Sequence, residues 1–470
     1  MSNFLINPTI KYKKRYRNNS YITFLKLSSQ IDMLLFYHQS MINTDLLQKS
    51  MIPSLIEKSK ISPNLETLSI PGITIIEEQD LDSKIFGGNI IIYNYKNKKL
   101  YSLSAQDIPT RQTSDPITDI SITGPRDALV ESNDKNVALI QKRIKNNELT
   151  VEKYVLGKKT NTDITLLYLN QISNSKIINE TKEKLTKNKL ESLTNIGQLQ
   201  SLLVDKKSLI PLLNYTSRPD FIAESLLKGR LVILIEGIPL ALIGPATFFY
   251  FLDYHDSLSE NYFSVLFDRL LFAISFFLAV FVAPFIMAVI SFYPEFLPLS
   301  LISSTINARK GISISFIDEV IVAEILFQTF RIAGTRLSQA MSASLLVVGS
   351  LLLGRAVIEA GILSQEALFV AAISVIASYV VSNNSSFNTS INLMRWLLFL
   401  ATALYGFVGL SIAFLLIIIY LVSRNSLSTP YMYPLAPLDP NALFKNLIPT
   451  NFLKKKKEGS EKNWKKFLQP

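Results

Sequence analysis

The sequence predicts an α/β soluble region of two subdomains, followed by an α-helical domain with several membrane spans. Residues 1–229 are rich in Lys, Asn, Asp and Glu, and strand-like and helix-like segments alternate within them. Most of the long apolar runs come after Arg269. A chain of 470 residues is long enough to hold both a soluble and a membrane part.

The residue types that most enzymes use for catalysis or metal binding are scarce. The chain has no cysteine and only two histidines, His38 and His255, which lie far apart in the sequence. Disulfides and thiol chemistry are therefore excluded, and no His/Asp/Glu cluster offers a metal site. Gly87-Gly88 matches neither a dinucleotide-binding nor a P-loop pattern. We expect no catalytic residue, no cofactor and no metal, and thus no enzyme.

Residues 1–25 are expected to form a basic N-terminal tail. They carry a Lys/Arg cluster between Lys11 and Arg17 and have no apolar stretch typical of a secretory signal. Such a cluster contacts either nucleic acid or an anionic membrane leaflet. The apolar spans further along the chain favour the leaflet, so we expect a lipid bilayer and no nucleic acid as partner.

The soluble region is expected over residues 26–252, with subdomains at about 26–110 and 111–252. Residue patterns predict its main elements, namely two strands within 84–104, a helix over 126–145, strands at 150–156 and 163–169, and a Lys/Glu-rich helix over 175–190. In the helix over 126–145 the apolar residues lie at helical spacing and charges occupy the other face, which predicts an amphipathic surface helix. These apolar residues are Leu129, Val137, Ile140 and Ile144.

The apolar run 231–251 has the length of a membrane helix but contains breaks. Glu236 to Pro239 interrupts its middle, and Pro245 follows. A helix there would lose hydrogen bonds at both prolines and would bury a carboxylate. Two buried strands joined by a Glu-Gly turn fit the pattern better, which places this run at the end of the soluble region.

Apolar stretches in residues 253–425 predict a helical membrane domain, because about 20 apolar residues cross a bilayer as a helix. They lie near 270–292, 341–360, 366–382 and 396–422, and Pro284 predicts a kink in the first.

Segment 316–336 is apolar enough to enter a membrane, yet it holds Asp318, Glu319, Glu324, Arg331 and Arg336. We expect it to lie in the interface, or to be partly re-entrant and covered by neighbouring helices.

Residues 426–470 are expected to form a cytoplasmic tail, because they are strongly basic, with four lysines from Lys454 to Lys457. The N-terminal region has no export signal and is expected in the cytoplasm too. Both ends on one side require an even number of crossings. Four is the smallest count that fits the strong spans, and six follows if 316–336 and one further segment also cross.

Ionisable residues in membrane segments are functional candidates, because burying charge in hydrocarbon is expensive. Arg355 and Glu359 lie four apart and share one helix face. They form a self-contained ion pair near the interface, or they line a water-filled path. Glu324 and Arg331 also share a face, and Glu324 either attracts cations near a pore mouth or pairs with Arg331 or an arginine of another chain. These four residues are the candidate pore or gating residues.

Two pairs of small residues are expected to let helices pack closely. Ser350 and Gly354 are four apart, and Gly406 and Gly409 lie in the last span. Such faces pack helices more often than they line pores, and an oligomeric channel needs both kinds of contact.

Several short motifs occur in order along the chain. They are Thr123–Glu131 (TGPRDALVE), Thr216–Asp220 (TSRPD), Glu236–Pro239 (EGIP), Leu297–Leu299 (LPL), Phe330–Leu337 (FRIAGTRL) and Pro430–Pro437 (PYMYPLAP). Through this ordered set the sequence resembles, along nearly its whole length, the A-subunit family of spore-germination (germinant) receptors, the GerA type.

The chain departs from the family pattern at several positions. Gln328 and Ile332 replace acidic residues, and Ser338 replaces a proline. Arg355 and Glu359 stand where family members carry glutamines. This last exchange puts any pore chemistry carried over from the family in doubt.

The resemblance implies a multi-pass protein of the spore inner membrane with cytoplasmic termini. A subunits of the family are implied to form homo-oligomeric, nutrient-gated ion channels that start germination. Implied partners are a permease-like B subunit, which binds the nutrient, and a lipoprotein C subunit. A family variant that acts beside the dipicolinate-release machinery fits the sequence equally well.

Two alternatives to a channel stay open. One is a secondary transporter, although the two halves of the chain show no internal repeat of the kind that transporters often have. The other is a non-conducting membrane scaffold whose soluble region recruits partners of the germination or dipicolinate-release machinery.

Overall fold

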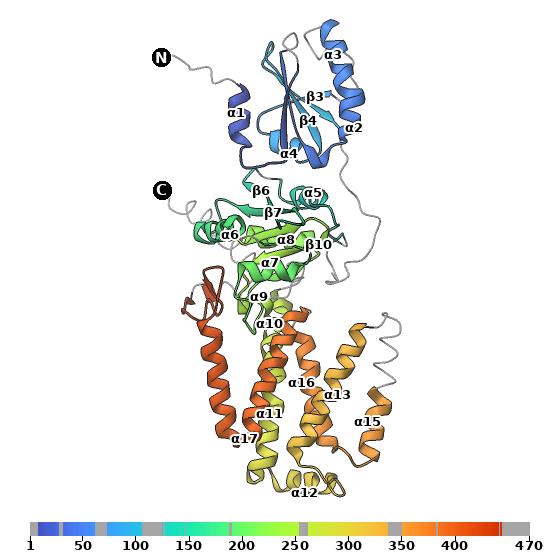
Figure 1. The fold of residues 1–470 in the computed structure, drawn as a ribbon, viewed down its shortest axis with the longest axis vertical. Coiled ribbons are helices and arrows are strands. Elements are labelled where there is room, and N and C mark those ends of the chain that lie inside the picture. Colours follow the sequence, from blue (N-terminus) through green and yellow to red (C-terminus); the bar gives the residue numbers. More distant parts are fainter. Residues whose placement is uncertain are drawn as a thin grey trace, which may run out of the picture. The chain divides into compact units, whose positions relative to one another are not determined.

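The computed structural model describes residues 8–27, 32–61, 73–105, 125, 127–145, 147–187, 190–252, 262–336, 350–381, 384–440 and 442–443. The chain divides into two compact units. The two-sheet unit comprises Met1–Lys207, Leu212–Pro245 and Ser426–Thr429, and the helical unit comprises Ser208–Pro211, Ala246–Asn425 and Pro430–Pro470. Figure 1 shows the β-sheets in the first unit and the helix bundle in the second.

The first sheet has the strand order β1-β2-β4-β5-β3, and neighbouring strands are antiparallel. Its strands are β1 (Ile22–Lys26), β2 (Met33–His38), β3 (Ile73–Ile76), β4 (Asn89–Asn94) and β5 (Leu100–Ser104). The helices and turns beside it are α1 (Pro8–Arg15), η1 (Gln39–Met41), α2 (Thr44–Leu46), η2 (Leu47–Met51), α3 (Ile52–Ile61) and α4 (Leu81–Ile85). All six residues of β2 are buried, because helices cover both faces of the sheet.

The N-terminal segment is folded, contrary to the expected tail over 1–25. Tyr12 of α1 and Tyr16, the residue directly after this helix, lie four apart and face the same side, and both are buried against Phe36 of β2. The first strand begins at Ile22, inside the expected tail. The lysines and arginines occupy the remaining face of α1, so the basic composition concealed an aromatic packing face.

The second sheet has the strand order β6-β7-β9-β10-β8, again with antiparallel neighbours. Its strands are β6 (Leu149–Leu156), β7 (Thr162–Leu169), β8 (Asn214–Thr216), β9 (Leu231–Ile235) and β10 (Ile238–Gly244). The helices of this part are α5 (Asn133–Arg143), α6 (Ser175–Lys187), α7 (Ile196–Leu203) and α8 (Pro219–Leu227). One apolar core joins the sheet to α6 and α7.

The structure confirms the strands expected within 84–104, at 150–156 and at 163–169, and the helix over 175–190. It also confirms that the run 231–251 begins with two paired strands rather than a membrane helix. Gly237, with a φ of 82°, makes the turn between β9 and β10, a conformation that favours glycine. The last part of the run forms α9 (Phe248–Leu252), which belongs to the helical unit.

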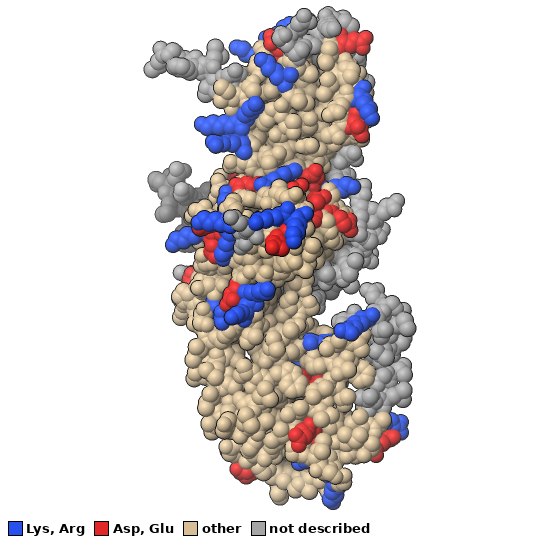
Figure 2. Space-filling model, in the orientation of Figure 1, with Lys and Arg blue, Asp and Glu red and all other residues tan. Residues whose placement is uncertain are grey.

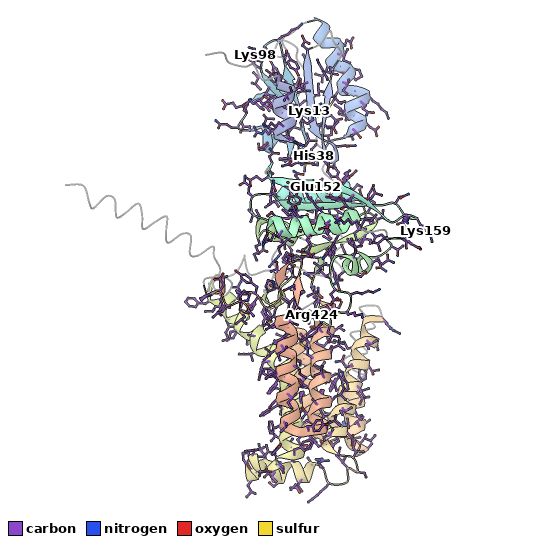
Figure 3. All side chains as sticks on the ribbon, turned by 60° about the vertical axis from the view of Figure 1, so that its left-hand side comes forward. Lys13, His38, Lys98, Glu152, Lys159 and Arg424 are labelled. Atoms are coloured by element: carbon purple, nitrogen blue, oxygen red, sulfur yellow. The ribbon has the colours of Figure 1, made fainter. Side chains whose placement is uncertain are left out.

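The helix expected over 126–145 differs in extent and setting. Its helical part is α5, so Leu129 precedes it, and seven residues of α5 are buried, including Gln141. Gln141 meets the first sheet, where its Oε1 lies 3.0 Å from Nε2 of the buried His38 and 3.3 Å from Nδ2 of Asn19. The His38 ring stacks on Tyr21 (Figure 3 labels His38). The helix is therefore buried at the junction of the two sheets and does not lie on the surface.

The helical unit consists mainly of long apolar helices. The helices and short helical turns among the described residues of this unit are α9, α10 (Tyr262–Phe277), η4 (Leu278–Val282), α11 (Ala283–Phe292), η5 (Pro294–Phe296), α12 (Leu299–Ala308), α13 (Phe316–Arg336), α15 (Ser350–Glu359), α16 (Gln365–Val381) and α17 (Ser385–Ser423). Charged side chains gather over the two-sheet unit, whereas the helical unit is mostly uncharged on the face shown in Figure 2.

Within the described residues, two helical stretches are long and apolar enough to cross a membrane, Leu266–Phe292 and Ser385–Ser423, and Gln365–Val381 is apolar but shorter. The first contains Pro284, directly after the π-helical turn η4. Proline has no N–H to donate, and its ring clashes with the preceding helical turn. The π-helical hydrogen bonds of η4 therefore lie where Pro284 predicts a kink. Of the segment expected to cross at 341–360, residues 341–349 lie outside the described residues and the rest forms α15.

The loops at one end of the unit show the direction of the helices. Ser364, just before α16, donates its backbone N–H to Glu319 near the start of α13. An ideal Cβ at Gly361, after α15, would lie 3.9 Å from the carbonyl oxygen of Gly311, which precedes α13. The end of α15 and the start of α16 therefore lie beside the start of α13, so α13 and α15 run in opposite directions. Segment 316–336 packs along its neighbours as a member of the bundle.

The last helix reverses its direction at Gly406. This residue has a φ of 59° and a ψ of −136° inside α17, which is not helical. A Cβ at Gly409 would lie 2.0 Å from the carbonyl oxygen of Ala401. In a continuous helix these residues would be separated by about 12 Å along the axis. Residues 385–405 and 407–423 thus form a tight helical hairpin.

Contacts with α10 and α11 agree with the hairpin. Before the turn, Arg395 bonds to Ala279, and Gly406 lies against Phe292, so this half runs parallel to α10 and α11. After the turn, the order of the ring contacts is reversed, with the pairs Phe407–Tyr293 and Phe414–Phe281. The single span expected at 396–422 is therefore divided between two antiparallel halves.

The chain after α17 also differs from the expected tail over 426–470. Strands β11 (Asn425–Ser426) and β12 (Thr429–Pro430) form a short hairpin. Its tip residue Leu427 is 3% exposed and belongs to the core of the second sheet. Tyr431 is fully buried. The lysine-rich residues 454–457 lie outside the described residues.

Candidate functional site

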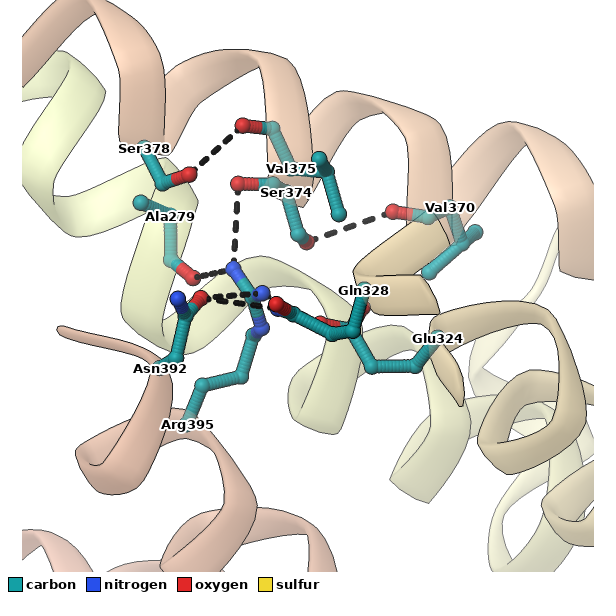
Figure 4. A network of polar contacts seen from close by, with 9 residues as sticks. All are labelled: Ala279, Glu324, Gln328, Val370, Ser374, Val375, Ser378, Asn392 and Arg395. Atoms are coloured by element: carbon teal, nitrogen blue, oxygen red, sulfur yellow. Dashed lines mark hydrogen bonds and ion pairs between the residues drawn. The ribbon is translucent and has the colours of Figure 1, made fainter. Parts of the chain in front are cut away.

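A buried ion pair lies at the centre of the helical unit. Arg395 of α17 donates from Nη2 to Oε1 of Glu324 on α13, and both side chains are 0% exposed. The other terminal nitrogen of Arg395, Nη1, donates to the backbone oxygens of Ala279 at 2.9 Å and Ser374 at 3.1 Å. One arginine therefore links η4, α13, α16 and α17 (Figure 4).

Two amide side chains complete this network. Asn392 accepts at Oδ1 from Nη2 of Arg395 at 2.7 Å and from Nε2 of Gln328 at 3.0 Å. Gln328 also donates to Glu324 at 3.1 Å. Because Gln328 lies one turn after Glu324, both side chains reach the same point between the helices. We call Glu324, Gln328, Asn392 and Arg395 the four-residue network.

Several polar atoms of the network have no hydrogen-bond partner among the described residues. They are Oε2 of Glu324, Nε of Arg395 and Nδ2 of Asn392. Burying a polar group without a partner is unfavourable, so the network stabilises one helix arrangement less than a fully satisfied one would. An element held in this way can exchange one helix arrangement for another.

A second ion pair connects the loops at the end of the bundle. Nε of Arg309, after α12, lies 2.9 Å from Oε1 of the fully buried Glu319 on α13. The second oxygen of Glu319 accepts the backbone N–H of Ser364 at 2.7 Å. This carboxylate therefore fixes the loop before α13 to the loop before α16.

Arg355 and Glu359 form an intrahelical pair on α15. The atoms Nε and Oε1 are 2.6 Å apart, and the side chains are 78% and 64% exposed. The opposite side of α15 packs through Val357 near α13 and α16. The pair thus faces away from the described part of its own bundle.

The remaining sequence candidates lie apart from the network. Glu324 and Arg331 share α13 but do not pair, and Arg331 is half-buried with no carboxylate in ion-pair distance among the described residues. Ser350 is the first residue of α15, and a Cβ at Gly354 would meet no atom of the described residues within 4 Å. Gly406 and Gly409 form the hairpin turn of α17 instead of packing two separate helices.

A family model covers almost the whole chain. The model described as Bacillus/Clostridium GerA spore germination protein matches residues 11–460. The chain belongs to the GerA family. This confirms the resemblance inferred from the ordered motifs.

Relatives of this GerA-family chain span most of its length. Spore germination protein XA of Bacillus anthracis is 30% identical over 411 residues, covering 87% of this chain and 81% of that protein. Spore germination protein KA of Bacillus subtilis is 30% identical over 424 residues, covering 88% and 78%. The crystal structure of the N-terminal domain of the A subunit of the Bacillus megaterium spore germinant receptor GerK3 aligns with 53% of this chain and 97% of that one, with a TM-score of 0.40 and 23% identity.

Three of the GerA-family motifs meet in the second sheet. In the first motif, Leu129 donates its backbone N–H to Ser217 of the second motif at 2.8 Å. Glu131 accepts the N–H of Gly237, in the third motif, at the same distance. Arg218 pairs with Asp220 at 2.6 Å. These motifs therefore form one structural junction.

Arg395 and Asn392 were missed in the sequence analysis of this GerA-family chain. The last span was expected at 396–422, which begins one residue after Arg395. An arginine between Leu393-Met394 and Trp396-Leu397 sits in an apolar surrounding, and this signal alone marks it as a functional candidate.

Proposed function

We propose that this GerA-family protein is the A subunit of a spore germinant receptor that forms a homo-oligomeric, nutrient-gated ion channel in the spore inner membrane. Membership of the family supports the role in germination. A permease-like B subunit that holds the nutrient and a lipoprotein C subunit are the proposed partners.

The proposed topology has six crossings. They are α10 with α11, α13, the chain segment that includes α15, α16 and the two halves of α17. The alternating directions of α13 and α15 and the hairpin at Gly406 support this count. An even number keeps both termini on the cytoplasmic side, as the basic C-terminal residues favour.

The observation that carries the channel proposal is the exposed pair Arg355–Glu359 on α15. In a bilayer, an ion pair that faced lipid would be strongly unfavourable. The face that carries it therefore meets water or another subunit. A ring of such faces around a central axis gives a water-filled path lined by charge. The four-residue network lies between other helices and would act on the gate rather than contact the ion.

Conductance of the receptor in planar bilayers tests the proposal. The full chain is reconstituted with its B and C subunits, and current is recorded before and after nutrient addition. We expect Glu359→Gln and Arg355→Gln to change ion selectivity in opposite directions, because they remove charges of opposite sign from the path. The matched control is Lys49→Gln, in the exposed i,i+4 pair Asp45–Lys49 of the two-sheet unit, which should leave the current unchanged.

The two alternatives predict other outcomes. A secondary transporter would show saturable solute uptake with fixed stoichiometry and no channel current. A scaffold would show neither current nor uptake, and deletion of the chain would leave the ion flux of the remaining subunits intact. Either result would contradict the channel proposal.

A further inference from the structure

Helix α12 lies across one end of the helical unit, whereas its neighbours α11 and α13 run along the unit (Figure 1). It joins the end of α11 to the start of α13, and its 10 residues span about 15 Å. The Gly406 turn lies at the same end, because a Cβ there would lie 3.1 Å from the ring of Phe292, the last residue of α11. In the proposed topology, α12 is therefore on the side of the membrane opposite to both termini.

Contacts of the chain on both sides of α12 set the direction of this helix. Before it, the ring of Tyr293 lies 5.0 Å from the ring of Phe407, which follows the hairpin turn of α17. After it, the guanidinium of Arg309 binds Glu319 of α13 through Nε at 2.9 Å and the carbonyl oxygen of Ile314 through Nη2 at 3.0 Å. The side chains that α12 leaves exposed therefore belong to a helix that is held at both of its ends.

The polar residues of α12 point away from the bundle. Ile302, Thr305 and Ala308 are half-buried, which marks the side of the helix that meets the bundle. Ser300 and Asn307 are exposed, and at about 100° per residue they lie about 140–160° around the axis from that side. The side of α12 that faces outward from the end of the bundle is therefore suited to contact with water.

Two large apolar residues of α12 lie on one flank, between the bundle side and the polar side. Leu299 and Ile306 are seven positions apart, so they lie about 20° apart around the axis. Their side chains are 82% and 60% exposed. We call these two residues the apolar flank. A helix with one polar side and an apolar surface beside it is typical of the boundary between lipid and water.

The apolar flank adjoins surfaces that face lipid in the proposed topology. Phe292 of α11 is 40% exposed and Leu404 of α17 is 71% exposed, both at the end of the bundle that α12 crosses. Both belong to the stretches that are long and apolar enough to span a membrane. A stable protein interface uses about 20–30 residues on each side, and two exposed side chains are far fewer. Lipid therefore fits the apolar flank better than a protein partner does.

We propose that α12 is an interfacial helix that binds the surface of the bilayer on the side opposite to the termini. Leu299 and Ile306 enter the lipid, and Ser300 and Asn307 face the water. The proposal rests on the proposed membrane crossings but not on ion conduction, so a chain that conducts no ions would leave it intact.

Nitroxide labels on single cysteines of the full chain in phosphatidylcholine nanodiscs test this placement, because the natural chain has no cysteine. Power saturation measures how accessible each label is to oxygen, which concentrates in lipid, and to a nickel chelate, which stays in water. We expect Leu299→Cys and Ile306→Cys to have a several-fold higher ratio of oxygen to nickel accessibility than Ser300→Cys and Asn307→Cys. The latter two are matched controls, since they are exposed positions of the same helix.

Two benchmark positions separate this proposal from the proposed crossings. Ile412→Cys, on an exposed position of α17, should favour oxygen, and Lys49→Cys in the two-sheet unit should favour nickel. With these benchmarks as expected, nickel access at all four positions of α12 would mean that the helix lies in water. Exclusion of both reagents from the apolar flank would mean that protein covers it. Either result would overturn the proposal, whereas a nickel preference at Ile412→Cys would overturn the crossing of α17 as well.

Discussion

The guanidinium of Arg395 and the carboxylate of Glu324 meet between the helices of the helical unit, and neither side chain is exposed. The residues are 71 positions apart in the chain. Breaking a buried pair by removing one partner is strongly unfavourable because the remaining charge is buried alone, whereas replacing both by apolar residues is often nearly neutral. Single and double substitutions of this pair are therefore expected to affect the stability of the helical unit differently.

We expect Arg395→Met and Glu324→Met each to destabilise the helical unit by about 3–5 kcal/mol, and the double variant to recover most of this loss. The apparent unfolding midpoint of the full chain in nanodiscs measures the effect. Lys49→Gln is the control, because the exposed pair Asp45–Lys49 should contribute about 0.5 kcal/mol or less. Additive losses in the double variant would show that the two charges do not stabilise each other.

The same pair should also influence gating. Arg395→Lys keeps the charge but removes the fork that reaches Ala279 and Ser374. We expect the proposed channel with this variant to open at a lower nutrient concentration, because η4 and α16 are held less firmly. Nutrient dose–response curves of spores carrying the variant measure this, and an unchanged half-maximal concentration would contradict it.

The hairpin at Gly406 brings both ends of α17 to the same end of the helical unit, which the proposed topology places on one side of the membrane. The natural chain has no cysteine, so single cysteines can be introduced without a background. We expect Ser385→Cys and Ser423→Cys to react with an impermeant maleimide from one side and Tyr405→Cys, which is 70% exposed, from the other. Labelling of positions 385 and 423 from opposite sides would favour one continuous span.

The two glycine positions Gly409 and Gly354 should respond oppositely to a methyl group. A Cβ at Gly409 would collide with the carbonyl oxygen of Ala401, so Gly409→Ala should disrupt the hairpin and lower the unfolding midpoint. Within the described part of the chain, a Cβ at Gly354 has no neighbour within 4 Å, and alanine is favoured over glycine in helices by about 1 kcal/mol. We expect Gly354→Ala to raise the midpoint slightly. Equal losses in the two variants would contradict the hairpin geometry.

Leu427 should contribute strongly to the two-sheet unit although it lies after the last helix. It is 3% exposed in the core that contains Leu213 and Leu242. We expect Leu427→Ala to lower the free energy of unfolding by about 2–5 kcal/mol, measured by pulse proteolysis in urea. The exposed Leu435, mutated to alanine, is the control and should change it by about 0.5 kcal/mol or less. Similar effects of both would mean that the hairpin is not packed.

His38 should make the two-sheet unit less stable in mild acid. Burial lowers the pKa of His38 to about 4 from 6.5, against the smaller opposing effects of Gln141 and Asp134, and Lys153 lowers it further. Between pH 6.5 and 4, the unfolded chain binds a proton that the folded chain does not. The contribution of neutral His38 to the free energy of unfolding is therefore fully present above pH 6.5. It is lost as the pH falls to about 4, and the loss is roughly 3 kcal/mol.

The pH dependence of pulse proteolysis checks this contribution. We expect His38→Gln to flatten the loss of stability between pH 7 and pH 4.5, whatever its effect at pH 7. His255→Gln, which changes the only other histidine of the chain, should leave the pH dependence as it is. An unchanged slope in His38→Gln would show that other groups cause the acid sensitivity.

The sequence alone determined the division into a polar N-terminal part and an apolar C-terminal part, several of the strands and the family. Local patterns suffice for these features. Glu236 to Pro239 shows that the run 231–251 starts as two strands, because a turn and two prolines are incompatible with one continuous helix. The ordered motifs identify the family without any knowledge of contacts.

Only the tertiary structure decided which charges meet and where the chain turns back. Glu324 has an arginine partner from α17, and no spacing on α13 reveals a residue 71 positions away. Gly406 and Gly409 fit a helix-packing pattern in the sequence, but their backbone geometry makes a reversal. Three buried residues lie in segments that are polar overall, namely Tyr12, Tyr16 and Leu427. Each is buried because strands from other parts of the sequence form a sheet with an apolar surface beside it. Long-range packing decides such features, and it outweighs local composition.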